Sequence, residues 1–333
     1  MRNVVGLAEV PDRVMELSLN ELFSGKSVMV TGGTGSFGHF IVQELLKLDV
    51  SEIVVFSRDE EKQLDMRREF PDARLKFIIG DVRDRERVLE STHTDYVYHA
   101  AALKVIPTCE ENPTEAYKTN VLGSLNVMEA CIKNAVQKGV LISTDKAVKP
   151  VNTYGMTKAL AEKTWLAPRS LSSTTTFGAV RYGNVVGSRG SIIPFFKQLM
   201  SQGRPLPITD RSMSRFMLTL SQAVNLVFFA TKTAIGGEIF IPKNPACKII
   251  DLAEAMAGKG YPLVNVGIRA GEKIAEVLIS EEEIRRTEVK EECFIIHPHG
   301  RFHDPSLANE FSSETARRLT VSEIASLVKR AGF

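Results

Sequence analysis

The chain of 333 residues exceeds the usual size of a single domain, and with 44% apolar and 25% charged residues it has the composition of a folded globular protein. Its 42 Lys and Arg residues nearly balance its 40 Asp and Glu residues, so the net charge of +2 gives no electrostatic argument for binding nucleic acid or an anionic membrane. No apolar run reaches the roughly 18 residues that cross a bilayer.

The cysteines and the N-terminus indicate the compartment. The four cysteines are dispersed and form no CxxC pair, which argues against a zinc site or a disulfide framework. Glu9, Asp12 and Glu16 interrupt the N-terminal segment, unlike the apolar centre of a signal peptide. We therefore expect a cytoplasmic protein without a bound metal.

Short β-branched runs alternate with longer amphipathic stretches from residue 27 onward. The predicted strands are Ser27–Val30, Glu52–Phe56, Leu75–Ile79, Tyr96–His99, Gly139–Ser143 and Thr176–Arg181. This alternation predicts βαβ units around a parallel sheet that is covered on both faces.

A glycine-rich turn follows the first predicted strand. The sequence TGGTGSFG, residues 31–38, precedes the helical pattern FIVQELLKL and fits both the GxGxxG and the TGxxGxxG fingerprints. A turn without Cβ atoms lets backbone N–H groups and a helix N-terminus meet a pyrophosphate. The expected cofactor-binding residues of this turn are Gly32, Thr34, Gly35, Ser36, Phe37 and Gly38.

The end of the second strand predicts which dinucleotide is bound. It lies about 20 residues past the glycines, where such folds select a ribose hydroxyl or a 2′-phosphate. Ser57, Arg58 and Lys62 favour the phosphate, whereas Asp59 could bind a bare ribose. We predict NADP rather than NAD, with a solvated, charged start of a helix as the alternative role of each side chain.

Residues that follow the third and fourth strands are also expected to border the cofactor. Asp81 and Val82 are expected to flank the adenine, and the small Ala101 and Ala102 let the backbone approach a cofactor. His99 is interpreted as a packed residue at a strand end, not as a catalyst.

The fifth strand leads into STDKAVKPVNTYGMTKA, residues 143–159. Tyr154 and Lys158 are four residues apart, so on a helix they project from one face. A phenol has a pKa of about 10, and a neighbouring ammonium together with a cationic nicotinamide would favour its phenolate. Tyr154 could then take a hydroxyl proton while hydride leaves the same carbon.

Beyond Gly183 the predicted elements become shorter and more mixed. We expect an α/β fold, a Rossmann-like doubly wound parallel sheet with a smaller C-terminal substrate-binding lobe. The expected divisions are an N-terminal extension over 1–25, a candidate arm for subunit contact, an NADP-binding Rossmann domain over 26–183, and a lobe over 184–333 from which some segments return to the first domain.

Several sequence motifs, in the same order along the chain, resemble those of a known family. TGGTGSFG and the YxxxK pair resemble the extended short-chain dehydrogenase/reductase superfamily. AALKVIP, STDKAVKPVNTYGMTK, VRYGNVVGSRGSIIPFF, ITDRSMSRF and IRAGEKIAEVLIS resemble the inverting UDP-N-acetylglucosamine 4,6-dehydratases of pseudaminic acid and related pathways. The resemblance covers residues 26–280.

The resemblance implies a dehydration. Oxidation of carbon 4 makes the proton on carbon 5 acidic, so water can leave across carbons 5 and 6. Lys146 then acts as the base at carbon 5, Asp145 assists departure of the carbon 6 hydroxyl, and Thr144 hydrogen-bonds the carbon 4 oxygen. For this role the pKa of Lys146 must fall from about 10.4, which burial and the positive charge of Lys158 would promote.

The resemblance also implies how UDP-N-acetylglucosamine is held. The expected residues are Lys104, which also borders the cofactor, Asn184, Arg215, Arg269 and Glu272. Two positions depart from the family pattern, Val105 in place of His and Met156 in place of a small residue. A homo-oligomer is expected.

Two alternatives remain open. A UDP-hexose 4-epimerase of the same fold needs Tyr154 and Lys158 but no acid and base for elimination, so STDK argues against it. A catalytically silent NADP-binding scaffold is the other, with Asp145 and Lys146 as a plain ion pair at a strand end.

Overall fold

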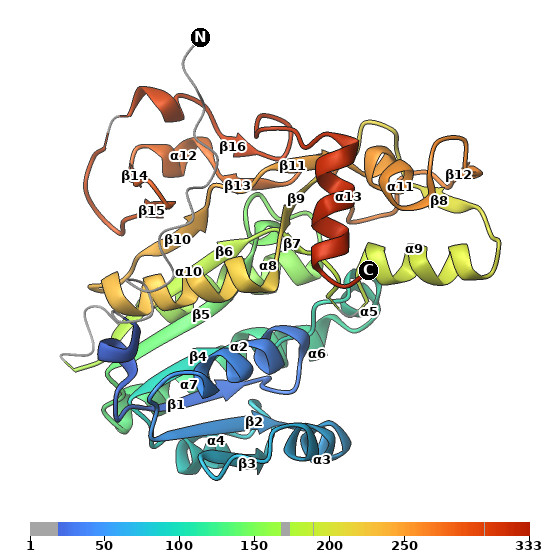
Figure 1. The fold of residues 1–333 in the computed structure, drawn as a ribbon. Helices are drawn as coiled ribbons and strands as arrows, with labels where there is room; N and C mark the ends of the chain where they lie inside the picture. Colours follow the sequence, from blue (N-terminus) through green and yellow to red (C-terminus); the bar gives the residue numbers. More distant parts are fainter. Residues whose placement is uncertain (1–18, 168–173, 189, 303) are drawn as a thin grey trace.

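The computed structural model describes residues 19–167, 174–188, 190–302 and 304–333. Most of the expected N-terminal extension, residues 1–18, lies outside these ranges. Within them a nine-stranded sheet runs in the order β14-β15-β10-β6-β5-β4-β1-β2-β3 (Figure 1). Its strands are β1 (Ser27–Thr31), β2 (Glu52–Ser57), β3 (Leu75–Ile79), β4 (Tyr96–His99), β5 (Lys138–Thr144), β6 (Thr176–Tyr182), β10 (Ile239–Pro242), β14 (Thr287–Val289) and β15 (Cys293–Ile296). The predicted parallel α/β fold is confirmed.

The order of the strands indicates where a ligand-binding crevice lies. β1 pairs in parallel with both β2 and β4, so the chain winds outward in opposite directions from these neighbours. Open α/β sheets bind ligands beyond the carboxyl ends of the strands at such a switch point. The loops after β1, β2, β4 and β5 meet at this edge.

Two layers of helices cover the sheet because alternate strand residues face opposite cores. Val28 and Val30 join one buried cluster with α2 (Ser36–Leu46) and α10 (Leu220–Thr233). Met29, between them, joins the other cluster with α4 (Arg85–Ser91), α7 (Gly123–Lys133) and α8 (Thr153–Leu166). Other helices of the described residues before β6 are α3 (Glu60–Glu69), α5 (Ile106–Glu111), α6 (Pro113–Tyr117), the π-helix Lys118–Leu122 and the 3-10 helix Asp145–Ala147, which follows β5 directly.

The segments after β6 form small sheets and helices over the carboxyl edge of the main sheet (Figure 1). The sheets pair β7 (Asn184–Val185) and β11 (Ala246–Lys248) with β9 (Ser214–Leu218), β8 (Leu206–Ile208) with β12 (Leu263–Asn265), and β13 (Val277–Ile279) with β16 (Phe311–Ser312). The helices of these described segments, besides α10, are α9 (Ile192–Ser201), α11 (Ile249–Ala257), α12 (Glu281–Ile284), α13 (Val321–Arg330) and the 3-10 helix Pro305–Leu307. β10 continues the main sheet in parallel beside β6, and β15 and β14 follow it as antiparallel pairs.

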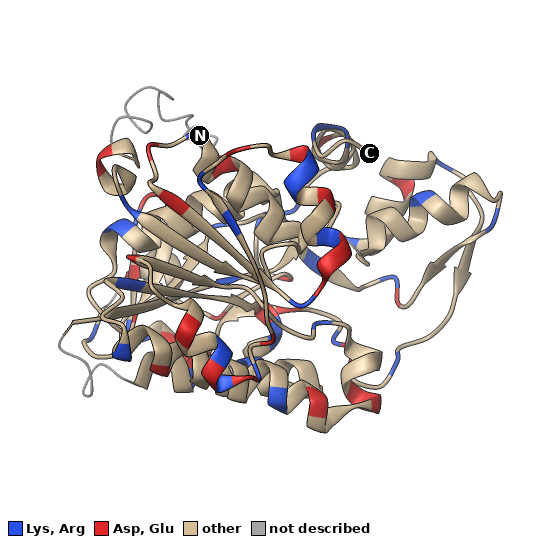
Figure 2. Ribbon diagram, turned by 90° about the horizontal axis from the view of Figure 1, so that it is seen from below, with Lys and Arg blue, Asp and Glu red and all other residues tan. Residues whose placement is uncertain are grey.

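Charged residues of both signs are interspersed over the outer helices, and the central strands carry few of them (Figure 2). None of the helices in the described ranges is both long and apolar enough to span a membrane.

Trp165 anchors α8 on the sheet, and its removal tests that packing. The indole is fully buried, stacks on His99 with ring centroids 5.4 Å apart, and donates to the Gly178 carbonyl at 3.1 Å. Trp165→Ala should lower the free energy of unfolding by about 3–5 kcal/mol. Urea unfolding followed by circular dichroism measures this loss. Lys163→Ala at an exposed position of α8 is the control, and an equal loss there would contradict the anchoring role.

Candidate active site

The glycine turn between β1 and α2 has no room for side chains at two positions. Gly32 has φ +66°, and a Cβ there would lie 2.9 Å from the Ala101 Cα. A Cβ on Gly38 would lie 2.4 Å from the Gly32 carbonyl oxygen. The backbone of this turn is therefore open to close approach at the N-terminus of α2, the arrangement that a pyrophosphate requires.

The end of β2 presents two cations to the same crevice. The Asp59 carboxylate caps α3, because its Oδ1 accepts from the Lys62 N–H at 3.0 Å, and it also pairs with the Lys62 ammonium. Arg58 is half exposed, with its guanidinium 3.4 Å from Asp81. Arg58, Asp59 and Lys62 all line the same cavity, where each cation is paired with a carboxylate and Asp59 also caps α3.

One cavity of about 870 Å³ brings the predicted site residues together. Its lining includes every predicted site residue except Asp145, which is fully buried behind it. The predicted residues in its lining are Gly32, Thr34, Gly35, Ser36, Phe37, Gly38, Ser57, Arg58, Asp59, Lys62, Asp81, Val82, Ala101, Ala102, Lys104, Thr144, Lys146, Tyr154, Lys158, Asn184, Arg215, Arg269 and Glu272.

Helix α8 places Tyr154 and Lys158 one turn apart in this cavity. Its N-cap Asn152 accepts from the Gly155 N–H at 2.7 Å, so the helix begins immediately before Tyr154. The Lys158 ammonium donates to the Ile142 carbonyl at 2.6 Å, and burial lowers its pKa to about 8 against the opposing charge of Glu162.

The surroundings of Tyr154 favour its protonated phenol. Burial raises its pKa to about 12, and the charge of Lys146 and a hydrogen bond from Thr144 oppose that rise. We expected Lys158 to favour the phenolate, but the cation that chiefly opposes the rise is Lys146. A nicotinamide cation would add to this opposition.

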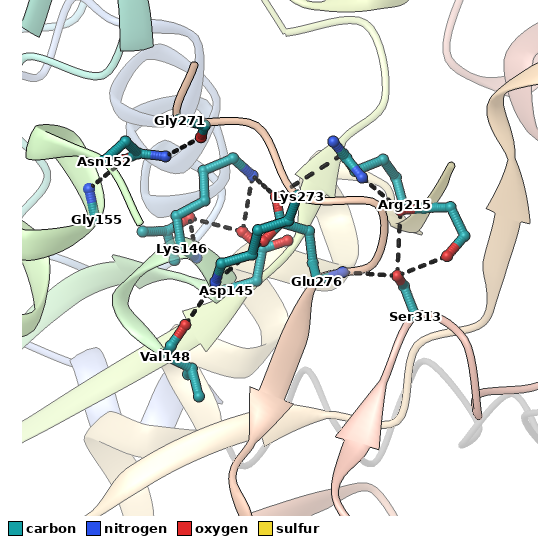
Figure 3. Close-up of polar contacts among 12 residues, drawn as sticks. Asp145, Lys146, Val148, Asn152, Gly155, Arg215, Gly271, Lys273, Glu276 and Ser313 are labelled. Carbon is teal, nitrogen blue, oxygen red and sulfur yellow. Dashed lines mark hydrogen bonds and ion pairs between the residues drawn. The ribbon is translucent and has the colours of Figure 1, made fainter. Parts of the chain in front are cut away.

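Lys146 lies between two carboxylates (Figure 3). Its Nζ is 3.0 Å from Asp145 Oδ1 and 3.1 Å from Glu276 Oε1. Burial alone would lower the pKa of Lys146, but the two carboxylates outweigh it and the pKa rises. The expected fall is therefore wrong, because sequence reasoning counted the positive neighbours and overlooked Glu276.

The carboxylates of Asp145 and Glu276 differ in the direction in which their pKa is shifted. Burial raises the pKa of Asp145 despite Lys146, and its Oδ2 is buried with no hydrogen-bond partner among the described residues. Burial also acts on Glu276, but Lys146, Arg215 and Lys273 outweigh it and lower its pKa. Asp145 is thus the carboxyl that accepts a proton more readily, and Glu276 is the one that stays ionised.

The residues predicted to hold the sugar nucleotide line the mouth and wall of the cavity. Burial lowers the pKa of Lys104, and Asn184 Oδ1 is buried without a hydrogen-bond partner in the described ranges. Arg215 on β9 donates to the Ser214 carbonyl at 2.7 Å. Arg269 is exposed and Glu272 is partly buried on one loop, where the Arg269 N–H donates to Glu272 Oε2 at 3.1 Å.

The structure also locates three further residues that the sequence singled out, His99, Val105 and Met156. His99 is buried and bonded to Thr31 and Ser124, which confirms a packed strand end. Val105 lines the cavity, whereas Met156 is 53% exposed and is not among the cavity's lining residues.

Sequence reasoning missed Glu276 and Lys273. Both lie within IRAGEKIAEVLIS, and Glu276 immediately precedes the fully apolar strand β13. An acid next to a buried strand is the one local signal that could have drawn attention to it.

Comparisons with known proteins find relatives over most of this chain. A family model described as "Polysaccharide biosynthesis protein" matches residues 28–298. The chain is 45% identical over 296 residues to the UDP-N-acetylglucosamine 4,6-dehydratase (inverting) of Campylobacter jejuni subsp. jejuni serotype O:2, an alignment that covers 87% of this chain and 88% of that protein. It is 43% identical over 328 residues to the UDP-glucose 4-epimerase of Rickettsia canadensis, with 92% and 96% covered.

Solved structures share the fold. The X-ray structure of Pen from Bacillus thuringiensis superposes with a TM-score of 0.88 at 37% identity, and the match covers 93% of this chain and 99% of that chain. DesIV, a dTDP-glucose 4,6-dehydratase from Streptomyces venezuelae, superposes with a TM-score of 0.69 at 20% identity, covering 74% and 86%.

Proposed function

This chain belongs to the polysaccharide biosynthesis protein family, and we propose that it is an NADP-dependent, inverting UDP-N-acetylglucosamine 4,6-dehydratase. One observation favours a dehydratase over a 4-epimerase, the other activity found among the similar proteins. Lys146 lines the same cavity as Tyr154, and its Nζ is 3.0 Å from Oδ1 of the fully buried Asp145. An epimerase that oxidises carbon 4 and reduces it again has no use for an acid and a base at carbons 5 and 6, whereas an elimination requires both.

The fit of the cofactor is supported by the glycine turn, where missing Cβ atoms leave space for a pyrophosphate. Arg58 and Lys62 would hold a 2′-phosphate, and Asp59 already caps α3. When bound, NADP would accept a hydride from carbon 4 and return it to carbon 6. Ser57, Asp81, Val82, Ala101 and Ala102 would border the rest of the dinucleotide.

The first proton transfer belongs to Tyr154. Its phenolate would take the carbon 4 hydroxyl proton, with the charges of Lys146 and Lys158 lowering the cost of that phenolate. Thr144 would hydrogen-bond the carbon 4 oxygen. The product of this step is a 4-ketone, which makes the carbon 5 proton acidic.

A single proton shift would prepare the elimination. Transfer of one proton from the Lys146 ammonium to Asp145, across 3.0 Å, gives an amine and a carboxylic acid together. The amine then takes the carbon 5 proton, the C–H electron pair forms the double bond to carbon 6, and the hydroxyl leaves with the Asp145 proton as water. Both side chains return to their starting charges. After hydride addition at carbon 6, carbon 5 would take a solvent proton on the other face, which inverts it, and Tyr154 would release to solvent the proton that it took from the carbon 4 hydroxyl.

The charged groups at the cavity support a diphosphate substrate. The cations of Lys104, Arg215 and Arg269 would pair with the two phosphates. Glu272 would hydrogen-bond a ribose hydroxyl, and Asn184 would contact the sugar. The product would be a UDP-4-keto-6-deoxy-L-arabino-hexose amino sugar, on the route to pseudaminic acid.

We also propose a cytoplasmic homo-oligomer. The four cysteines are free and buried, as suits a reducing compartment. Met156 and Leu160, one turn apart on α8, are each about half exposed and would be covered by a second copy.

Incubation of the purified protein with UDP-N-acetylglucosamine in heavy water, followed by NMR, tests the proposal. We expect loss of the carbon 6 hydroxyl, a 4-ketone in equilibrium with its hydrate, deuterium at carbon 5 and the L-arabino configuration. A new carbon 4 epimer that retains its carbon 6 hydroxyl would establish the epimerase instead, and unchanged substrate would favour a silent scaffold.

Arg58→Ala tests the choice of NADP. Because a hydrogen bond to a charged group contributes about 1.5–3 kcal/mol, the dissociation constant for NADP should rise roughly 10- to 100-fold while that for NAD changes little. Titration calorimetry measures both. Arg68→Ala on the outer part of α3, where Arg68 is 71% exposed, is the matched control. An equal loss of NAD and NADP affinity in Arg58→Ala would contradict the role in phosphate binding.

A further inference from the structure

The segment 271–276 is bonded to the catalytic segment 145–152 at three points (Figure 3). Asn152 Nδ2 donates to the Gly271 carbonyl at 2.7 Å, and the Lys273 ammonium donates to the Val148 carbonyl at 2.7 Å. The third contact joins Lys146 to Glu276 at 3.1 Å. The proposed function uses Lys146 but assigns nothing to Glu276.

Glu276 is held firmly in place by its backbone. It immediately precedes β13, its N–H donates to Ser313 Oγ at 2.9 Å, and its carbonyl accepts from the Ser313 N–H at 2.7 Å. Its side chain is only 3% exposed, yet Glu276 is among the residues that line the cavity. The carboxylate is therefore aimed at Lys146 by rigid structure and not by a flexible loop.

The cluster around Lys146 contains charges of both signs. Asp145 precedes Lys146 in the chain, and Glu276 contacts it from the residue before β13. Arg215 on β9, Tyr154 on α8 and Lys273 complete the cluster. Glu276 is 3.8 Å from Arg215 Nε and 3.7 Å from Lys273 Nζ. Burying so many charges costs more than it returns in stability unless each is well paired, so a role in catalysis is the better account of the cluster.

We propose that Glu276 is a positioning residue for the elimination: it holds the Lys146 ammonium in the cavity opposite Asp145 and sets how readily Lys146 releases its proton. The inference rests on the proposed function. While Lys146 is charged it favours the Tyr154 phenolate that oxidation needs, and Lys146 must then give up its proton for water to leave. Glu276 would thus keep Lys146 charged until the ketone has formed.

The test measures Lys146 directly. In competitive labelling with acetic anhydride, read by mass spectrometry across a pH series, Lys146 reacts only when it is neutral. Glu276→Gln keeps the shape and removes the charge, so the pH at which Lys146 becomes reactive should fall by about one to three pH units. Glu276→Asp, whose carboxylate is one methylene farther from Lys146, should give a smaller fall, and it provides the test if the Gln variant does not fold. Glu314→Gln, an exposed acid nearby, should leave the labelling unchanged.

Kinetics supply the second readout. In Glu276→Gln the rising limb of the kcat profile for water loss should move to lower pH with the labelling curve, while KM for UDP-N-acetylglucosamine changes less than about threefold. Identical Lys146 labelling in the wild type and in the folded variants would overturn the proposal. If the wild type releases no water from the sugar, the proposed function fails, and the labelling still decides the role of Glu276.

Discussion

Tyr154→Phe should lower the rate of carbon 4 oxidation by a factor of about 10²–10⁴ while the protein remains folded. The substitution removes one buried hydroxyl and keeps the ring. Without the phenol no group at this position can take the hydroxyl proton as the hydride leaves. Rapid mixing of NADP-loaded protein with UDP-N-acetylglucosamine, followed by the absorbance of the reduced nicotinamide, measures this step.

The control is the same substitution at another buried phenol. Tyr98 is fully buried and bonded to Thr231 Oγ1 at 3.0 Å, outside the lining of the cavity. Tyr98→Phe should therefore oxidise the sugar at the wild-type rate. Normal oxidation by Tyr154→Phe would show that another base acts on the carbon 4 hydroxyl.

Lys146→Ala should separate the two halves of the reaction. Tyr154 and the cofactor site remain, so some oxidation at carbon 4 continues, although loss of the Lys146 charge slows it. Elimination loses its base and should fall by about 10²–10⁴-fold, so the 4-keto sugar with its carbon 6 hydroxyl accumulates. Quenching the reaction at short times and analysing the sugar nucleotides by mass spectrometry distinguishes this ketone from the dehydrated product.

Two further variants sharpen this result. Lys146→Arg keeps a positive charge for Asp145 and Glu276 but cannot be deprotonated, so it should oxidise better than the alanine variant and still fail to eliminate water. Lys149→Ala, three residues away, removes an exposed lysine whose partner is Glu310, and it should behave as the wild type. Normal dehydration by Lys146→Ala would refute the role of Lys146 as the base.

The parallel strands could be predicted because their physics is local. Ser27–Thr31 and Lys138–Thr144 are runs of apolar and β-branched residues that fill two cores at once, and each is bounded by turns. The glycine turn and the Tyr154–Lys158 spacing are local in the same sense. These segments were enough to predict most of the fold and the residues proposed for oxidation at carbon 4.

Long-range pairing could not be predicted in the same way. β10 lies beside β6 although about 60 residues separate them in the chain, and nothing in the sequence of Ile239–Pro242 specifies that neighbour. The same limit explains the error at Lys146. Its charge depends on Glu276, 130 positions later in the chain, so a reading confined to neighbouring residues gives the wrong sign.

The three bonds between the catalytic segment and residues 271–276 also matter for protein engineering. A chimera that takes its sugar-recognition segment from a relative would replace Glu276 and Lys273 together with the residues that read the sugar. Such an exchange would alter the charged surroundings of Lys146 and Asp145 as well as the selectivity. Grafts designed to change the accepted sugar should therefore transfer 143–158 and 269–276 as one unit, and shuffling libraries with a crossover between them should be depleted of active clones.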